Sequence, residues 1–311
     1  MKVFLTGVSG FVGRNLARAL LDSGHSVIAA VRPTSDRSRI PVGCDVRVAD
    51  IEHWRSVAEH LEDVDAIQHV AGAVKARTQE DFDRINAGST SAIVKAALEV
   101  CPGALFVLTS SQAACGPCGT GPVTAYGRSK VLAEHAVTGM NRYAVVRPPA
   151  VFGPGDPATE NLFKWASRGF TVSTGGEPGG FPLIGVTDLA LFMTLVMTSP
   201  GALGKTLQPS WPELITWKRF HAALEEAFNR RIIRLRVPSF MVHTAGIFSE
   251  VLSTFTGACP MVTRDKAREL TAPSWVLLQH EVEELTGWKP RQSPEDILKQ
   301  IAGSFCAGAC P

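Results

Sequence analysis

The glycine pattern after the first apolar run constrains the fold of this chain more than any other feature. Lys2–Leu5 reads as a buried strand, Thr6-Gly-Val-Ser-Gly-Phe-Val-Gly13 follows it directly, and residues 12–21 read as a helix. Such glycines permit a tight turn and a close approach to a pyrophosphate, and the helix N-terminus offers N–H groups and a positive dipole end. The pattern predicts a dinucleotide site, whose expected members are Gly7, Gly10, Phe11, Val12 and Gly13.

Short apolar runs alternate with helical stretches through the first half of the chain. The expected strands are residues 2–5, 26–31, 45–48, 66–70, 105–109 and 143–146, and the expected helices are 12–21, 54–61, 81–100 and 126–137. Strands that are apolar throughout and separated by crossover-length segments are typical of a parallel sheet with both faces covered. The fold class expected is therefore α/β, a doubly wound parallel Rossmann sheet.

The alternation of strand-like and helical segments ends near residue 153. Gly153–Pro157 and Gly175–Gly180 are rich in turn residues, and they flank one short helical stretch, Asn161–Arg168. We therefore expect residues 1–155 to form the dinucleotide-binding domain, together with a returning segment at about 181–205. Residues 156–180 and 206–311 are expected to form a smaller C-terminal substrate-binding cap.

Composition excludes several classes of partner. Lys and Arg total 31 against 29 Asp and Glu, giving +2 with no long run of like charge, so no nucleic-acid partner is expected. No apolar window of eighteen residues occurs, so no integral membrane segment is expected. The N-terminus lacks the features of a signal peptide, which favours a cytoplasmic protein acting on a small molecule.

The seven cysteines are an odd number, which favours reduced thiols over a disulfide framework. Cys115 and Cys118 have the spacing of half a zinc site or of a redox pair. No second Cys/His pair at ligand spacing completes a set of four ligands, so no metal is predicted.

The end of the second strand predicts the choice of cofactor. An NAD site usually presents Asp or Glu there, whereas this chain has Arg32. Its planar guanidinium can clamp a 2′-phosphate, and Arg37 is a weaker second candidate. NADP(H) is therefore favoured; NAD(H), with Arg32 a solvated loop residue, stays open.

Tyr126 and Lys130 lie four residues apart, on one face of an expected helix. A free tyrosine, with a pKa of about 10, is a poor acid at neutral pH, but a neighbouring ammonium stabilises the phenolate. Hydroxyls of Ser110 and Ser111, after the fifth strand, could bond a substrate oxygen. An isolated i, i+4 pair is weak evidence, because such pairs are common on helix surfaces.

With the N-terminal glycine loop, this pattern resembles the extended branch of the short-chain dehydrogenase/reductase superfamily, the NAD-dependent epimerase/dehydratase-like enzymes. Further matches occur in order along the chain: Ala49-Asp50-Ile51, His69-Val70-Ala71-Gly72, Ile85-Asn86-Ala87-Gly88-Ser89-Thr90, Arg147-Pro148 through Val151-Phe152-Gly153-Pro154, Gly185-Val186-Thr187-Asp188 and Gly287-Trp288-Lys289-Pro290. The departures are Phe152 for Tyr, and Gly185 and Thr187 for the more usual His and Asp; none belongs to the expected acid/base set.

The resemblance implies roles for residues at matching positions. Tyr126 would be the general acid/base, Lys130 would assist it and bond the nicotinamide ribose, and Ser111 would hold the reacting oxygen. It adds the following cofactor-binding residues: Asp50, Ile51, Val70, Ala71, Gly72, Thr109, Tyr126, Lys130, Pro148 and Val151. Asn86 is expected either to relay protons and hold water or to be structural. A homodimer through residues 81–100 and 126–137 is a family-level expectation.

Two reactions share such a scaffold. An NADP(H)-dependent oxidoreductase would reduce a carbonyl, or oxidise an alcohol, on a bulky apolar molecule, and a nucleotide-sugar epimerase or dehydratase would hold NAD tightly. The apolar stretch Pro238–Phe255 resembles dihydroflavonol-reductase and 3β-hydroxysteroid-dehydrogenase-like members and favours the first; its plain alternative is cap core. A membrane-surface helix is a third alternative for this stretch, less favoured because its polar face lacks Lys and Arg. Lys164, Arg168, Lys218 and Arg219 could serve a sugar nucleotide. A non-catalytic NADP(H) sensor is a minor alternative.

Overall fold

The computed structural model describes the chain except residues 176–179, 239, 242–243, 245–274, 276–278 and 308–311. Most of the stretch Pro238–Phe255 therefore lies outside the described residues, as do the central four residues of Gly175–Gly180. None of the helices within the described ranges is long and apolar enough to cross a bilayer.

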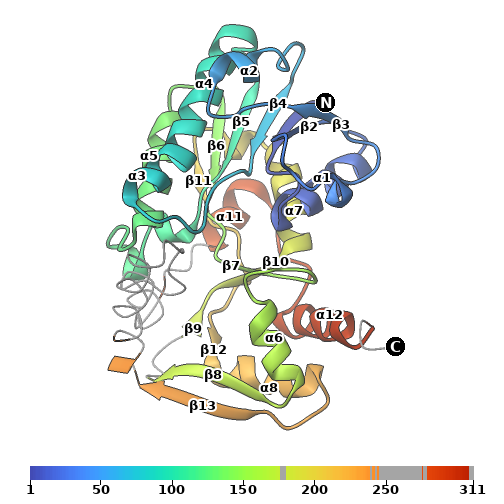
Figure 1. Ribbon diagram of the computed structural model, residues 1–311, viewed down its shortest axis with the longest axis vertical. Coiled ribbons are helices and arrows are strands. Elements are labelled where there is room, and N and C mark those ends of the chain that lie inside the picture. The colour runs from blue at the N-terminus through green and yellow to red at the C-terminus, as the bar shows by residue number, and fades with distance from the viewer. Residues whose placement is uncertain (176–179, 239, 242–243, 245–274, 276–278, 308–311) are drawn as a thin grey trace.

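A seven-stranded parallel sheet organises the first half of the molecule (Figure 1). Its order is β3-β2-β1-β4-β5-β6-β11, which confirms the doubly wound parallel sheet expected from the sequence. The strands are β1 Lys2–Thr6, β2 Ser26–Val31, β3 Asp45–Val48, β4 Ala66–His69, β5 Leu105–Thr109, β6 Tyr143–Val146 and β11 Thr206–Leu207. The strand order reverses between β1 and β4, and ligands of such sheets bind outside the carboxyl ends of the strands at this point.

Helices cover both faces of the sheet, and the sequence alternation explains why (Figure 1). Val3 and Leu5 of β1 point into a core shared with α1 (Phe11–Asp22) and α7 (Val186–Val196), whereas Phe4 points into the opposite core. The second core is closed by α2 (Trp54–Ala58), α4 (Ser89–Val100) and α5 (Ala125–Val137). Burial on both faces therefore requires strands that are apolar throughout.

A third core lies below the carboxyl edge of the sheet (Figure 1). We call the elements around it the cap: α6 Glu160–Ser167, β8 Phe170–Gly175, β9 Gly180–Phe181, β12 Ile215–Thr216, α8 Trp217–Ala227, β13 Ile233–Pro238 and α12 Pro294–Ala307. Phe152, Phe163 and Phe220 form its aromatic centre. The short strands β7 (Ala150–Phe152) and β10 (Leu183–Gly185) pair with each other, and α11 (Gln279–Thr286) completes the described helices.

One expected helix differs from the structure. The stretch expected to be helical from 81 to 100 begins as α3 (Gln79–Phe82), continues as a π-helical turn over Asp83–Gly88, and only then becomes α4. Two hydroxyls satisfy carbonyls in this turn: Ser89 Oγ donates to Ile85 O and Thr90 Oγ1 donates to Asn86 O. Such turns are rare and often occur at functional sites, and the apolar period gives no sign of this one.

Candidate active site

The glycine loop lies against the loop that follows β4. Gly7 has φ +74°, and a Cβ placed on it would lie 2.7 Å from Ala71 N. A Cβ on Gly13 would lie 2.0 Å from Gly7 O, so helix α1 packs directly on the turn. No side chain caps α1 at Gly10. The first N–H groups of this helix and the small cradle between Gly7 and Gly10 therefore fit a pyrophosphate.

Lys130 is buried at the carboxyl end of β5. Its Nζ donates to Thr109 O at 2.9 Å and lies 6.0 Å from the ring centroid of Tyr126, one turn earlier on α5. Burial lowers the pKa of Lys130 from 10.5 to about 8, while the nearby Glu134 carboxylate raises it. The ammonium is therefore held in a dry site beside the phenol, where its field is weakly screened.

Gly72 leaves room for this ammonium. A Cβ on Gly72 would lie 2.8 Å from Asn86 Oδ1 and 3.1 Å from Lys130 Nζ, so both polar atoms face the backbone of the loop after β4. Any side chain at this position would compete with the ammonium for space.

Ser110 and Ser111 have different surroundings although they are adjacent. Ser110 is buried and its hydroxyl donates to Glu134 Oε1, whose carboxylate also binds Arg147 through Nε at 2.8 Å and Nη2 at 2.6 Å. Ser111 is half-buried, and its Oγ accepts the N–H of Ala113 at 3.2 Å. The proton of Ser111 has no acceptor among the described residues, so this hydroxyl can donate to a ligand.

Asn86 is buried in the π-helical turn, and its amide is fully engaged. Nδ2 donates to Ala73 O and to Ser129 Oγ, and Oδ1 accepts the N–H of Ala73. These bonds fasten the loop after β4 to helix α5. The arrangement favours the structural role over a proton relay.

Behind the site, His69 links the glycine loop to the π-helical turn. Its Nδ1 lies 2.7 Å from Thr6 Oγ1, which also accepts the N–H of Ala71, and its Nε2 lies 3.1 Å from Thr90 Oγ1. Burial, aided by the Lys130 ammonium, lowers the pKa of His69 to about 3. The imidazole is therefore neutral near pH 7.

The bonds of this chain determine the tautomer. Thr90 uses its only hydroxyl proton on Asn86 O, so His69 Nε2 must carry the proton and donate to Thr90. Nδ1 then accepts from Thr6, whose oxygen is left to accept from Ala71. Thr6, His69 and Thr90 thus join the glycine loop, the end of β4 and the start of α4 by hydrogen bonds. The sequence patterns did not reveal this structural role.

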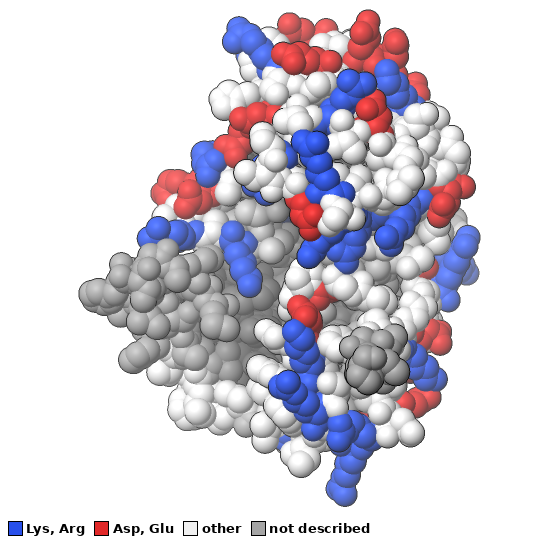
Figure 2. Space-filling view, turned by 45° about the vertical axis from the view of Figure 1, so that its right-hand side comes forward, with Lys and Arg blue, Asp and Glu red and all other residues white. Residues whose placement is uncertain are grey.

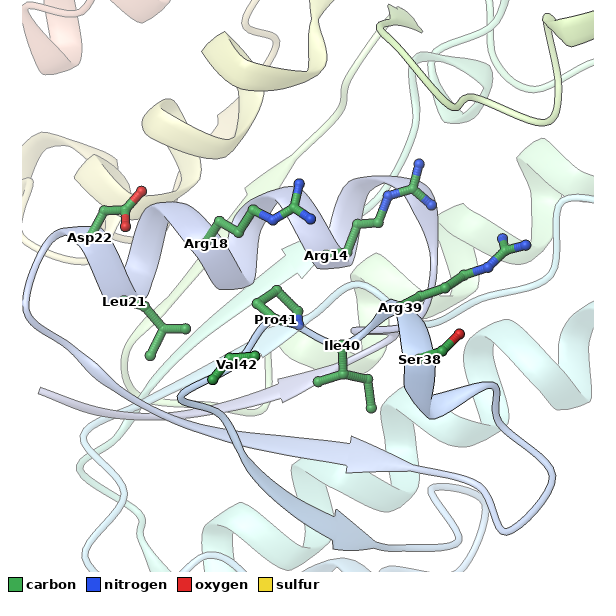
Figure 3. Close-up of a pocket in the computed structure, with 9 residues that line it drawn as sticks. All are labelled: Arg14, Arg18, Leu21, Asp22, Ser38, Arg39, Ile40, Pro41 and Val42. Carbon is green, nitrogen blue, oxygen red and sulfur yellow. The ribbon is translucent and has the colours of Figure 1, made fainter. Parts of the chain in front are cut away.

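Arginines gather at the end of β2. Arg32 and Arg37 are exposed, and neither forms an ion pair within the described ranges. Beyond them a cavity of about 600 Å³ lies between α1 and the loop after β2 (Figure 3). Arg14 and Arg18 of α1 line it together with Arg39 of the loop.

These cations act on one another. Burial lowers the pKa of Arg14, and the charges of Arg39 and Arg18 lower it further. Arg14 Nη2 donates to Gly155 O at 2.7 Å, and Arg39 pairs with Asp36. The region is therefore cationic and suits an anion. The sequence patterns identified Arg32 and Arg37 but neither Arg14 nor Arg39, because only the fold brings α1 beside this loop.

The remaining expected cofactor residues lie along the carboxyl edge. Asp50 follows β3, where its Oδ1 accepts the N–H of Glu52 and its Oδ2 contacts His53, and the first of these bonds lowers its pKa. Ile51 packs beside it on the second core. Pro148 O accepts the N–H of Gln112, and Val151 and Val70 pack against the first core.

Two further donors lie beyond the end of β11. Gln208 Nε2 and Trp211 Nε1 are buried and have no acceptor within the described structure. Gln208 follows Leu207, whose carbonyl accepts the N–H of Arg147 just after β6. Sequence reasoning missed both.

Cys115 and Cys118 are not joined in a disulfide, and no group of three metal-binding side chains occurs within the described chain.

Comparison with known proteins identifies the family. The model of the NAD dependent epimerase/dehydratase family matches residues 3–204. Ceramide reductase of Caulobacter vibrioides (strain NA1000 / CB15N) is 31% identical over 276 residues, covering 88% of this chain and 85% of that protein. The 2-alkyl-3-oxoalkanoate reductase of Stenotrophomonas maltophilia (strain K279a) is 24% identical over 334 residues, covering 99% and 100%.

Solved structures agree on the fold. The UDP-glucose 4-epimerase of Thermus thermophilus, in complex with NAD, matches with a TM-score of 0.77 at 18% identity, covering 100% of both chains. The chain therefore belongs to the NAD-dependent epimerase/dehydratase family of extended short-chain dehydrogenases/reductases, and it is an NAD(P)-dependent oxidoreductase.

Proposed function

We propose that this enzyme reduces a carbonyl group on a bulky, apolar small molecule with NADPH, or catalyses the reverse oxidation. The single observation that carries the proposal is the buried Lys130 ammonium, held on Thr109 O beside Tyr126, with a pKa lowered to about 8. Burial of the Lys130 ammonium lowers the folding stability of the protein, and groups with such perturbed pKa values often serve a functional site. Beside Tyr126, the ammonium can stabilise a phenolate.

NADP(H), when bound in the glycine loop, would supply or accept the hydride. Ser111 donates its hydroxyl proton to the substrate oxygen and orients it, because the neighbouring Ser110 proton is already committed to Glu134. Tyr126 then gives its phenolic proton to the oxygen as negative charge develops there, and the Lys130 ammonium stabilises the phenolate that remains. Glu134, fixed by Arg147, helps to keep Lys130 protonated.

The cationic end of the cofactor site supports NADP(H). Arg32 and Arg37 have no acidic partner within the described ranges, and the cluster of Arg14, Arg18 and Arg39 adds positive potential nearby. A 2′-phosphate would neutralise charges that otherwise repel one another. The adenosine ribose of NAD(H) offers them no anion.

The cap supports an apolar substrate over a sugar nucleotide. Arg219 donates to Glu295 at 2.8 and 3.2 Å and to Glu213 at 2.9 Å, and Lys164 pairs with Glu160. Two of the four cations considered for a diphosphate are thus already compensated by carboxylates. The two relatives named above as reductases carry names that refer to ceramide, a lipid, and to a 2-alkyl-3-oxoalkanoate, an oxo acid with an alkyl substituent.

A substrate screen tests this proposal. Aromatic and polycyclic ketones and long-chain 3-oxo compounds are incubated with NADPH, and cofactor oxidation is followed by absorbance with Tyr126→Phe as the matched control. We expect turnover of at least one apolar ketone by the parent enzyme alone. Interconversion of UDP-glucose and UDP-galactose without added nicotinamide, with no ketone reduced, would replace the proposal with the epimerase alternative.

A further inference from the structure

The two-stranded ribbon of the cap has an inverted polarity pattern. β13 pairs in parallel with β8, matching Ile233 with Phe170 and Leu235 with Val172. Ile233 is 65% exposed and Leu235 49%, whereas Thr171 and Ser173, on the other face of β8, are buried. An amphipathic ribbon ordinarily buries its apolar face, so this one leaves apolar side chains in water where polar ones would be expected.

The exposed apolar face extends beyond the ribbon. Trp165 of α6 stacks on Phe170 with ring centroids 6.2 Å apart, and it is 39% exposed. Phe240 and Met241, just after the end of β13, are 70% and 50% exposed. We call Trp165, Val172, Ile233, Leu235, Phe240 and Met241 the apolar face of the cap.

Three arginines border the start of this face. The N–H of Ile233 donates to Gly169 O, so the ribbon begins next to Arg168, and Arg230 and Arg231 immediately precede β13. All three are exposed, and none has an acidic partner in the described part of the chain. Arg230 also donates to Ser167 O, which fixes it beside the face. Figure 2 shows Lys and Arg side chains gathered at the lower end of the molecule, where the cap lies.

From this combination we infer that the apolar face of the cap docks on the surface of an anionic lipid bilayer. Apolar side chains can enter the boundary between headgroups and acyl chains while the bordering guanidiniums bind lipid phosphates. Charge complementarity favours lipid over a second copy of the chain. In a two-fold contact through the same face, both copies would bring the same arginines to the interface, and the residues of the face include no carboxylate to pair with them. The inference is independent of the reaction that the active site catalyses.

Vesicle co-sedimentation tests the inference on the full chain. The probes are vesicles of phosphatidylcholine alone and vesicles with an equal part of phosphatidylglycerol, at low and high salt. We expect binding to the anionic vesicles that weakens as salt rises. The variant Arg168→Gln/Arg231→Gln should bind at least tenfold more weakly, since each arginine near such a surface contributes about a fivefold factor. Ile233→Thr/Leu235→Thr, which keeps β-propensity, should also lose about tenfold.

The matched control is Arg142→Gln/Leu203→Thr. Both residues are exposed and precede strands β6 and β11, at the edge of the sheet opposite the cap. This control should bind vesicles like the parent. Thermal unfolding and cofactor binding establish that each variant is folded.

Three outcomes would overturn the inference. The first is absence of binding to anionic vesicles. The second is vesicle binding that neither cap variant weakens. The third is a dimer on analytical ultracentrifugation that dissociates in the Ile233→Thr/Leu235→Thr variant and binds no lipid, which would assign the face to a second copy.

Discussion

Replacing Lys130, the proposed partner of the acid/base tyrosine, by methionine should make the protein more stable while abolishing turnover. Lys130 is buried, and its pKa falls from 10.5 to about 8 because burial penalises the charged form. That difference corresponds to about 3 kcal/mol of lost folding free energy at neutral pH. Methionine fills nearly the same volume without charge. It forfeits the bond to Thr109 O, which is worth about 1 kcal/mol, so Lys130→Met should gain about 2 kcal/mol.

The stability difference between the parent and Lys130→Met should also depend on pH. Below pH 8 the lysine is protonated in both the folded and the unfolded chain, and the full penalty is present. Between 8 and 10.5 the folded protein releases this proton while the unfolded chain keeps it, so the parent protein recovers stability as pH rises. The advantage of Lys130→Met should therefore shrink over this interval.

Thermal unfolding of parent and variant, followed by circular dichroism at pH 7 and pH 10 without cofactor, measures both effects. A gain of about 2 kcal/mol should raise the Tm at pH 7 by roughly 4 °C. At pH 10 most of the difference should vanish. A variant that melts at or below the parent temperature at pH 7, or a gain that is the same at both pH values, would refute the reasoning.

Three further predictions concern activity and cofactor binding. Tyr126→Phe should lower kcat by about 10²-fold or more and leave NADPH affinity nearly unchanged in a fluorescence titration, because the phenol acts in the transition state; more than a tenth of the parent kcat would contradict this. The parent should bind NADPH at least about tenfold more tightly than NADH, and Arg32→Asp should invert the order, as calorimetry can show. Glu134→Gln removes a charge that raises the pKa of Lys130, so the alkaline limb of the kcat profile should move about one unit lower; an unmoved limb would exclude this coupling.

The doubly wound sheet was predictable from the sequence, because burial on both faces leaves a direct mark on it. Residues 26–31, 105–109 and 143–146 are largely buried strands of this kind. Residues 45–48 also form a strand, as expected, but it lies at the edge of the sheet and all four of its residues are exposed. The π-helical turn at Asp83–Gly88 was not predictable. It changes the hydrogen-bond pattern by one residue without disturbing the apolar period that defines a helix in sequence.

The geometry of the candidate site was predictable only where its residues are close in sequence. Tyr126 and Lys130 are four residues apart, and a helix places them together whatever the rest of the chain does. Glu134 and Arg147 are 13 residues apart on different elements, so only the packing of α5 against the sheet reveals that they pair. The roles of Ser111, Arg32 and the other expected site residues stay predictions, as do the domain boundaries and the homodimer.

His69 shows why a matching motif does not by itself explain a residue. In sequence it is one polar residue at the end of an apolar strand, and it could as well be a ligand or a base. Burial lowers its pKa and so disfavours a protonated imidazole, and both ring nitrogens already have hydrogen-bond partners, which argues against a role as a general base. Thr6 and Thr90 occupy both ring nitrogens and set one direction of donation from His69 through Thr90 to Asn86. A buried chain of hydrogen-bonded neutral groups thus joins the glycine loop, the end of β4 and the π-helical turn, whose Asn86 lies with Lys130 beside Gly72.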